Sequence, residues 1–151
     1  MNVLFVCTAN GGRSVISERL LERDAGGRHH ARSAGSMPGP GAHPEVIEAL
    51  GELGIDASDH VPQKLNQELI DWADVVVATC DDSCPYVPGK HYANWQLPDP
   101  KNQPIERVRA IRDDIAARVA HLVGDPLDVI GRAVDGGNLK GVGARIGIVL
   151  E

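Results

Sequence analysis

The first 25 residues change from an apolar strand pattern to a helical pattern across one short turn. Asn2–Val6 has the composition of a buried strand, and Ser14–Asp24 repeats apolar side chains at helical spacing before Gly26 and Gly27. A strand that runs through a tight turn into a helix is a building unit of α/β folds. The turn over Cys7–Arg13 brings backbone N–H groups and the positive end of the helix dipole to one point, which suits an anion.

Strand and helix patterns continue to alternate until about residue 122. Further strands are predicted at His30–Ala34, Ala73–Thr79 and His91–Trp95, and further helices at Pro44–Leu53, Asn66–Trp72 and Pro104–Leu122. The run of Val75, Val76 and Val77 is typical of a strand that is covered on both faces of a parallel sheet. The sequence therefore predicts a doubly wound, four-stranded parallel α/β sheet with its sites at the carboxyl ends of the strands.

Length and composition fit one domain. The chain has 151 residues, and we expect a domain over residues 1–123 and a glycine-rich extension over residues 124–151, which holds seven of the 17 glycines and is assigned no function. The net charge of −6 argues against a nucleic-acid-binding protein. No apolar run reaches the roughly 20 residues of a membrane span. Because no signal peptide is evident, we expect a cytoplasmic protein. We also expect a monomer.

The turn after the first strand carries the residues of a nucleophilic anion site. Arg13 can contact two oxygens of a tetrahedral oxyanion at once, and the positive field favours the nucleophilic thiolate of Cys7. Ser14 is interpreted as the cap of the following helix, as a donor to the sulfur of Cys7, or as both. A nucleotide-binding P-loop is disfavoured because it needs a longer loop and a lysine. The candidate binding residues are Thr8, Ala9, Asn10, Gly11, Gly12 and Arg13.

The other two cysteines, Cys80 and Cys84, follow the apolar third strand. If that strand pairs with the first, Cys80 and Cys7 share one edge of the sheet. Three cysteines without a secretory signal indicate reactive thiols. We favour a redox pair over a zinc half-site, which has only His91 close by in sequence, and we assign no metal. Asp99, in an Asp-Pro turn, is the candidate general acid that protonates a leaving oxygen.

At these residues the chain resembles the low-molecular-weight tyrosine phosphatase superfamily, and within it the arsenate reductases of the thioredoxin-coupled, three-cysteine type. The resemblance runs from residue 1 to about residue 122. Phosphatases of the family usually carry aromatic residues after the Asp-Pro pair, whereas Lys101 and Asn102 follow it here, which disfavours an aryl substrate. In addition, Gly11–Gly12 replaces a bulkier pair. The matching segments are Val3–Ser14, Ser33–Gly35, Cys80–Pro85 and Trp95–Pro100.

The resemblance implies a mechanism in which the thiolate of Cys7 attacks loop-bound arsenate while Asp99 protonates a leaving oxygen. Cys80 then attacks Cys7, so that arsenite leaves and a Cys7–Cys80 disulfide remains. Cys84 moves the disulfide outward to Cys80–Cys84. Thioredoxin reduces this outer disulfide with electrons that come from NADPH through thioredoxin reductase. No bound cofactor is expected.

Other classes of function stay open at this point. A phosphatase that acts on phosphotyrosine or small phosphate esters needs the same loop and acid, but neither Cys80 nor Cys84. A non-catalytic thiol protein would bind arsenite or zinc through the three cysteines without turnover. Within the reductase hypothesis, mycothiol or glutathione could replace thioredoxin as the reductant.

Overall fold

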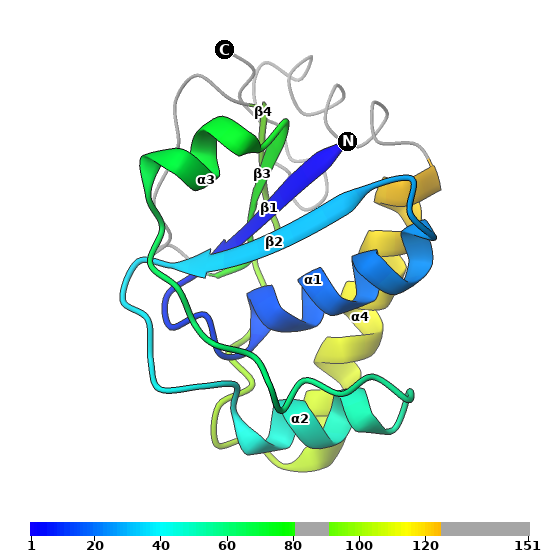
Figure 1. Ribbon diagram of the computed structural model, residues 1–151. Helices are drawn as coiled ribbons and strands as arrows, with labels where there is room; N and C mark the ends of the chain where they lie inside the picture. The colour runs from blue at the N-terminus through cyan, green and yellow to red at the C-terminus, as the bar shows by residue number, and fades with distance from the viewer. Residues whose placement is uncertain (81–90, 125–151) are drawn as a thin grey trace.

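The computed structural model describes residues 1–80 and 91–124, which form alternating strands and helices (Figure 1). The strands are β1 (Asn2–Cys7), β2 (His30–Gly35), β3 (Val75–Ala78) and β4 (His91–Asn94). The helices are α1 (Arg13–Ala25), α2 (Pro44–Gly51), α3 (Gln67–Trp72) and α4 (Ile105–Gly124). Each predicted strand and helix is present, with small differences at the ends. Residues 125–151 of the predicted extension lie outside the described residues.

The strands form one parallel sheet in the order β2-β1-β3-β4, which confirms the predicted fold class. β1 is central: Val3 pairs with Ala31 on one side and with Val75 on the other. Because β1 and β3 are neighbours, their carboxyl ends bring Cys7 and Cys80 to the same edge of the sheet. The topology that the sequence left open therefore takes the arrangement that a relay between these two residues requires.

Alternate residues of the central strands pack into separate cores on the two faces of the sheet. Val3 and Phe5 face α1, α2 and α4, whereas Leu4 and Val6 face the side that is covered by α3 (Figure 1). Both cores are built from buried, mostly aliphatic side chains, so the β1 backbone is held from both faces. This rigid strand is the support from which the Cys7 loop projects.

Among the described residues, no helix combines the length and the apolar character that crossing a membrane would require.

Candidate active site

The segment between β1 and α1 forms a cradle whose carbonyl groups all point outward. Each carbonyl oxygen from Cys7 to Gly12 accepts a hydrogen bond from outside the cradle, at 2.8–3.2 Å. Across a trans peptide, the N–H of the next residue points the opposite way. The N–H groups of residues 8–13 therefore face the inside of the loop, as the predicted anion site requires. The donors to the carbonyls are the N–H groups of Ser36, Met37, Gly39, His43 and Ile16 and Nε2 of His60.

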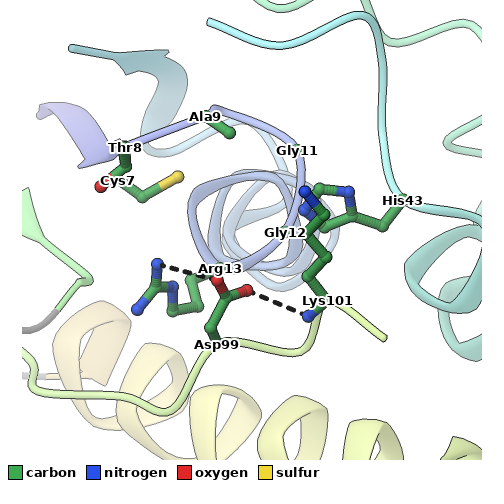
Figure 2. Close-up of a pocket in the computed structure, with 9 residues that line it drawn as sticks. All are labelled: Cys7, Thr8, Ala9, Gly11, Gly12, Arg13, His43, Asp99 and Lys101. Atoms are coloured by element: carbon green, nitrogen blue, oxygen red, sulfur yellow. Dashed lines mark hydrogen bonds and ion pairs between the residues drawn. The ribbon is translucent and has the colours of Figure 1, made fainter. Parts of the chain in front are cut away.

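A cavity of about 200 Å³ lies over the cradle (Figure 2). It contains the predicted nucleophile, Cys7, the predicted oxyanion ligand, Arg13, and the predicted acid, Asp99. Asn10, by contrast, is fully buried and does not line the cavity, so it supports the loop from behind. The full lining consists of Cys7, Thr8, Ala9, Gly11, Gly12, Arg13, His43, Asp99 and Lys101.

A directed chain of hydrogen bonds ends at the sulfur of Cys7. The backbone N–H of Gln63 donates to Oδ1 of Asn10 at 3.0 Å, which fixes the orientation of this amide. Nδ2 of Asn10 consequently donates to Oγ of Ser14 at 2.9 Å. The same Oγ is hydrogen-bonded to the sulfur of Cys7, 2.9 Å away, and when Cys7 is a thiolate the hydroxyl is the donor. Asn10 itself has a left-handed backbone, with φ 54°, which turns the loop.

The interpretation of Ser14 as a helix cap is wrong. α1 begins at Arg13 and its N-cap is Gly12, and within the described residues no side chain caps this end. Ser14 lies inside the first turn, so its side chain is turned toward Cys7 instead of toward the free backbone N–H groups. The structure therefore contains the expected contact between the Ser14 hydroxyl and the sulfur of Cys7, but not the expected helix cap.

Arg13 joins the cradle to the segment that carries the candidate acid. Its Nη1 donates to the carbonyl oxygen of Leu97 at 3.1 Å, and its Nη2 lies 3.9 Å from Oδ2 of Asp99. The side chain of Arg13 is only 8% exposed, whereas that of Asp99 is 56% exposed. A buried guanidinium that lines the cavity is held in place by its carbonyl contact and can bind an oxyanion there.

The Asp99-Pro100 turn packs directly against the loop. Oδ1 of Asp99 accepts a hydrogen bond from the backbone N–H of Lys101 at 3.0 Å, which closes the turn (Figure 2). Pro100 is buried against Gly12, where a Cβ would lie only 2.8 Å from Cγ of the proline. The turn thus brings the carboxyl group of Asp99 to the mouth of the cavity, where the sequence predicts a general acid.

A second set of polar contacts braces the loop from below. Oγ of Ser33 on β2 donates to Oε1 of Glu18 on α1 at 2.5 Å, and Nε2 of Gln63 donates to the carbonyl oxygen of Ser33 at 3.0 Å. Burial raises the pKa of Glu18 above its ordinary value, although the hydrogen bond from Ser33 lowers it. Gln63 takes part in both sets of contacts, so it links the strand, the helix and the loop.

The second cysteine of the predicted relay lies next to the nucleophile's strand. Cys80 is buried two residues after the end of β3, and its sulfur is 3.9 Å from the carbonyl oxygen of Val6, the residue before Cys7. Cys7 has a free thiol, whereas Cys80 is disulfide-bonded. The third cysteine of the predicted relay, Cys84, lies outside the described residues.

Sequence reasoning missed several residues of this site. His43 lines the cavity, and His60 and Gln63 hold the loop from outside. Lys101, which was predicted only to disfavour an aryl substrate, also lines the cavity. None of them belongs to a helix or strand pattern, and each is far from Cys7 in the chain. The available signal was indirect: the glycine pair Gly11–Gly12 leaves space that another segment has to fill.

A match to a family model agrees with this geometry. The model of the low molecular weight phosphotyrosine protein phosphatase matches residues 2–132. The chain belongs to this family. Its curated relatives include arsenate reductase 2 of Staphylococcus epidermidis, which is 31% identical over 121 residues that cover 78% of this chain and 92% of the relative.

Solved structures of the same fold fall into both reductase and phosphatase classes. A thioredoxin-dependent arsenate reductase from Corynebacterium glutamicum is 39% identical, with a TM-score of 0.66, over 80% of this chain and 59% of its own. An arginine phosphatase from Geobacillus stearothermophilus is 28% identical, with a TM-score of 0.69, over 84% of this chain and 93% of its own. The family membership therefore supports enzymatic chemistry on a tetrahedral oxyanion and leaves the choice between the two classes to the site itself.

Proposed function

We propose that the protein is an arsenate reductase in which Cys7 is the nucleophile and Cys80 and Cys84 form the disulfide relay. The observation that carries this proposal is the position of Cys80, which is buried at the end of β3 beside the strand that ends at Cys7. A phosphatase of this type needs one thiol, whereas reduction of arsenic needs a second sulfur close to the first. The arsenate reductases among the relatives support the same choice.

In the first step, arsenate binds with its oxygens on the inward N–H groups of residues 8–13 and on the guanidinium of Arg13. The thiolate sulfur of Cys7 forms a bond to arsenic, and one arsenic–oxygen bond breaks. Asp99 supplies the proton with which this oxygen leaves as water. Because the side chain of Asp99 is 56% exposed, solvent can return the proton.

In the second step, the thiolate of Cys80 attacks the sulfur of Cys7. A sulfur–sulfur bond forms, the sulfur–arsenic bond breaks, and its electron pair stays on arsenic, which leaves as arsenite. The thiolate of Cys84 then attacks Cys80 and releases Cys7 as a thiolate. A thioredoxin dithiol reduces the Cys80–Cys84 disulfide and is itself oxidised, with NADPH as the electron source through thioredoxin reductase. A disulfide at Cys80 beside a free Cys7 supports this sequence of steps.

A phosphatase is the second candidate, and the cradle itself favours it. Cys7, Arg13 and Asp99 all line one cavity, and these three residues suffice for attack on a phosphate ester and protonation of the leaving group. The likeness to an arginine phosphatase agrees with this possibility. Lys101 argues against a phosphotyrosine substrate, because it follows the Asp-Pro pair directly, at the position where phosphatases of the family usually carry an aromatic residue.

The deciding experiment measures NADPH oxidation by the purified protein with arsenate, thioredoxin and thioredoxin reductase, beside hydrolysis of an aryl phosphate. The variants are Cys7→Ser, Cys80→Ser and Cys84→Ser. We expect arsenate-dependent oxidation of NADPH that each substitution abolishes, whereas aryl phosphate hydrolysis, where present, is lost only in Cys7→Ser.

Other outcomes assign the protein differently. Turnover of arsenate that survives in both Cys80→Ser and Cys84→Ser contradicts the relay and indicates mycothiol or glutathione, which can be added to the assay as the reductant. Steady aryl phosphate hydrolysis without any arsenate reduction makes the protein a phosphatase. Arsenite binding by the reduced protein without turnover of either substrate indicates the non-catalytic thiol protein.

A further inference from the structure

His43 packs against Gly11 and Gly12, the part of the loop that has no side chains. Its backbone N–H donates to the carbonyl oxygen of Gly11 at 2.9 Å, which fixes the residue at the start of α2. Its imidazole covers the glycine pair: a Cβ on Gly11 would lie 3.0 Å from Cε1, and a Cβ on Gly12 would lie 3.2 Å from Cδ2. The ring therefore fills the space that larger loop side chains would take, and it does so from a different segment of the chain.

His43 also separates two hollows of the surface. One is the cavity of about 200 Å³ over the cradle. The other, called the adjoining hollow here, has a volume of about 320 Å³. His43 and Lys101 line both of them. The rest of the adjoining hollow is formed by Pro40, Gly41, Ala42 and Pro44.

The position of His43 relative to Cys7 determines where the organic part of a substrate would have to lie. In Figure 2, His43 and Lys101 lie across the loop from Cys7, and Asp99 lies between Arg13 and Lys101. In an in-line displacement, the leaving group departs opposite the attacking sulfur. Any organic group that is carried by the leaving oxygen must therefore extend past His43, Lys101 or Asp99.

We propose that His43 is a specificity-determining residue, whose imidazole forms a wall between the cradle and the adjoining hollow and restricts the cradle to inorganic tetrahedral oxyanions. An arsenate or phosphate ion ends at the wall, whereas the organic group of an ester or of a phosphonate collides with it. This inference deepens the proposed function, because it names the class of oxyanion that the same site accepts. Removal of the imidazole joins the two hollows and gives an organic substituent a place to lie.

The wall acts by its size and not by a charge. Burial lowers the pKa of His43 below its ordinary value, and Lys101 and Arg13 lower it further, whereas Asp99 and Glu45 raise it. A ring with a lowered pKa is neutral at pH 7 and adds no cationic attraction for an anion. A phenyl ring in its place should consequently preserve the discrimination.

The test compares the dissociation constants of inorganic phosphate and phenylphosphonate, which cannot be hydrolysed, by calorimetry at pH 7. In the unsubstituted protein, phosphate should bind at least about tenfold more tightly than phenylphosphonate. In His43→Ala the ratio of the two constants should fall about tenfold, and in His43→Phe it should stay close to the original ratio. His30→Ala is the matched control, because this exposed histidine lies at the opposite end of β2.

Three results would overturn the inference: equal affinities for the two ligands in the unsubstituted protein, an unchanged ratio in His43→Ala, or a ratio in His43→Phe that matches the alanine variant. The first of these needs no variant, so the inference stays testable where a substitution prevents folding. Neither ligand is reduced, so the binding ratio is independent of Cys80 and Cys84. If the protein fails to reduce arsenate but shows the expected ratio of dissociation constants, the proposed reductase activity is wrong, whereas the proposed role of His43 is supported.

Discussion

The substitution Gly35→Ala tests whether the cradle is held by close backbone contact. Gly35 ends β2 and pairs with Cys7, directly below the loop. A Cβ at this position would lie 2.5 Å from the carbonyl oxygen of Thr8 and 2.9 Å from the backbone N of Asn10. Both are backbone atoms, so no side chain can rotate away from the added methyl group. Gly35 is itself held from the other side, because its N–H and carbonyl group are hydrogen-bonded to Gln63 and Leu65.

The size of the effect follows from these distances. The contact with Thr8 is about 0.9 Å short of the 3.4 Å at which ordinary van der Waals contact begins. Overpacking of this kind costs about 1–3 kcal/mol, which lowers the Tm by roughly 3–10 °C for a domain of this length. A shift of the loop by about 1 Å also displaces its inward N–H groups from the oxyanion, and such a displacement costs about 100-fold in rate.

The assay measures the Tm by circular dichroism and the affinity for inorganic phosphate in the same preparations. Gly51→Ala in α2 is the matched control, because its Cβ would meet no atom of the described residues within 4 Å. Alanine in place of Gly51, the last residue of α2, should leave phosphate binding unchanged and stabilise the protein by about 0.4–1 kcal/mol. A Gly35→Ala protein with the original Tm and phosphate affinity would refute the account of how the loop is supported.

Three further outcomes are expected. Arg13→Lys should lower kcat/KM for arsenate at least about 100-fold, because a single ammonium cannot replace the two N–H donors with which the guanidinium binds an oxyanion. A kcat/KM within about threefold of the original value would contradict this role of Arg13. Ser14→Ala should lower kcat about 10- to 100-fold through the lost contact with the sulfur of Cys7, and an unchanged kcat would show that the hydroxyl has no part in the reaction. Hydrogen bonds from Arg109 lower the pKa of Glu52 to about 2, so carbon-detected NMR should show titration near that value. The associated stability is present above pH 4.5 and lost as the pH falls through the lower pKa, so a pKa near 4.5 would contradict the contact.

The parts of the site that the sequence predicted are those that follow from local patterns. Cys7 and Arg13 lie at a strand–helix junction, and the pattern of apolar residues identifies such a junction without tertiary information. The position of Cys80 beside Cys7 needed one additional fact, the pairing of β1 with β3. Asp99 was found because the chemistry demands an acid and an Asp-Pro turn is a recognisable local structure.

The parts that the sequence did not predict depend on contacts between distant segments. Four of the six outward carbonyls of the loop are paired by backbone N–H groups of residues 36–43, and a backbone hydrogen bond leaves no signature in the side-chain sequence. Gln63 braces Asn10 with its own backbone N–H, so its side-chain type says little about this role. The cap assigned to Ser14 was wrong because the N-cap of α1 is Gly12, two residues earlier, so the hydroxyl of Ser14 lies inside the first turn and contacts Cys7.

The cradle alone cannot decide between reductase and phosphatase, because arsenate and phosphate present the same charge and nearly the same tetrahedron to the N–H groups and to Arg13. The distinction arises after the first bond to Cys7 has formed. Water attack on that adduct returns an oxyanion with its oxidation state unchanged, whereas attack by Cys80 on the sulfur of Cys7 leaves the electron pair on arsenic. The product therefore depends on which nucleophile reaches Cys7 first. The position of Cys80 beside the end of β1 favours sulfur, and the exposure of Asp99 keeps water available to compete.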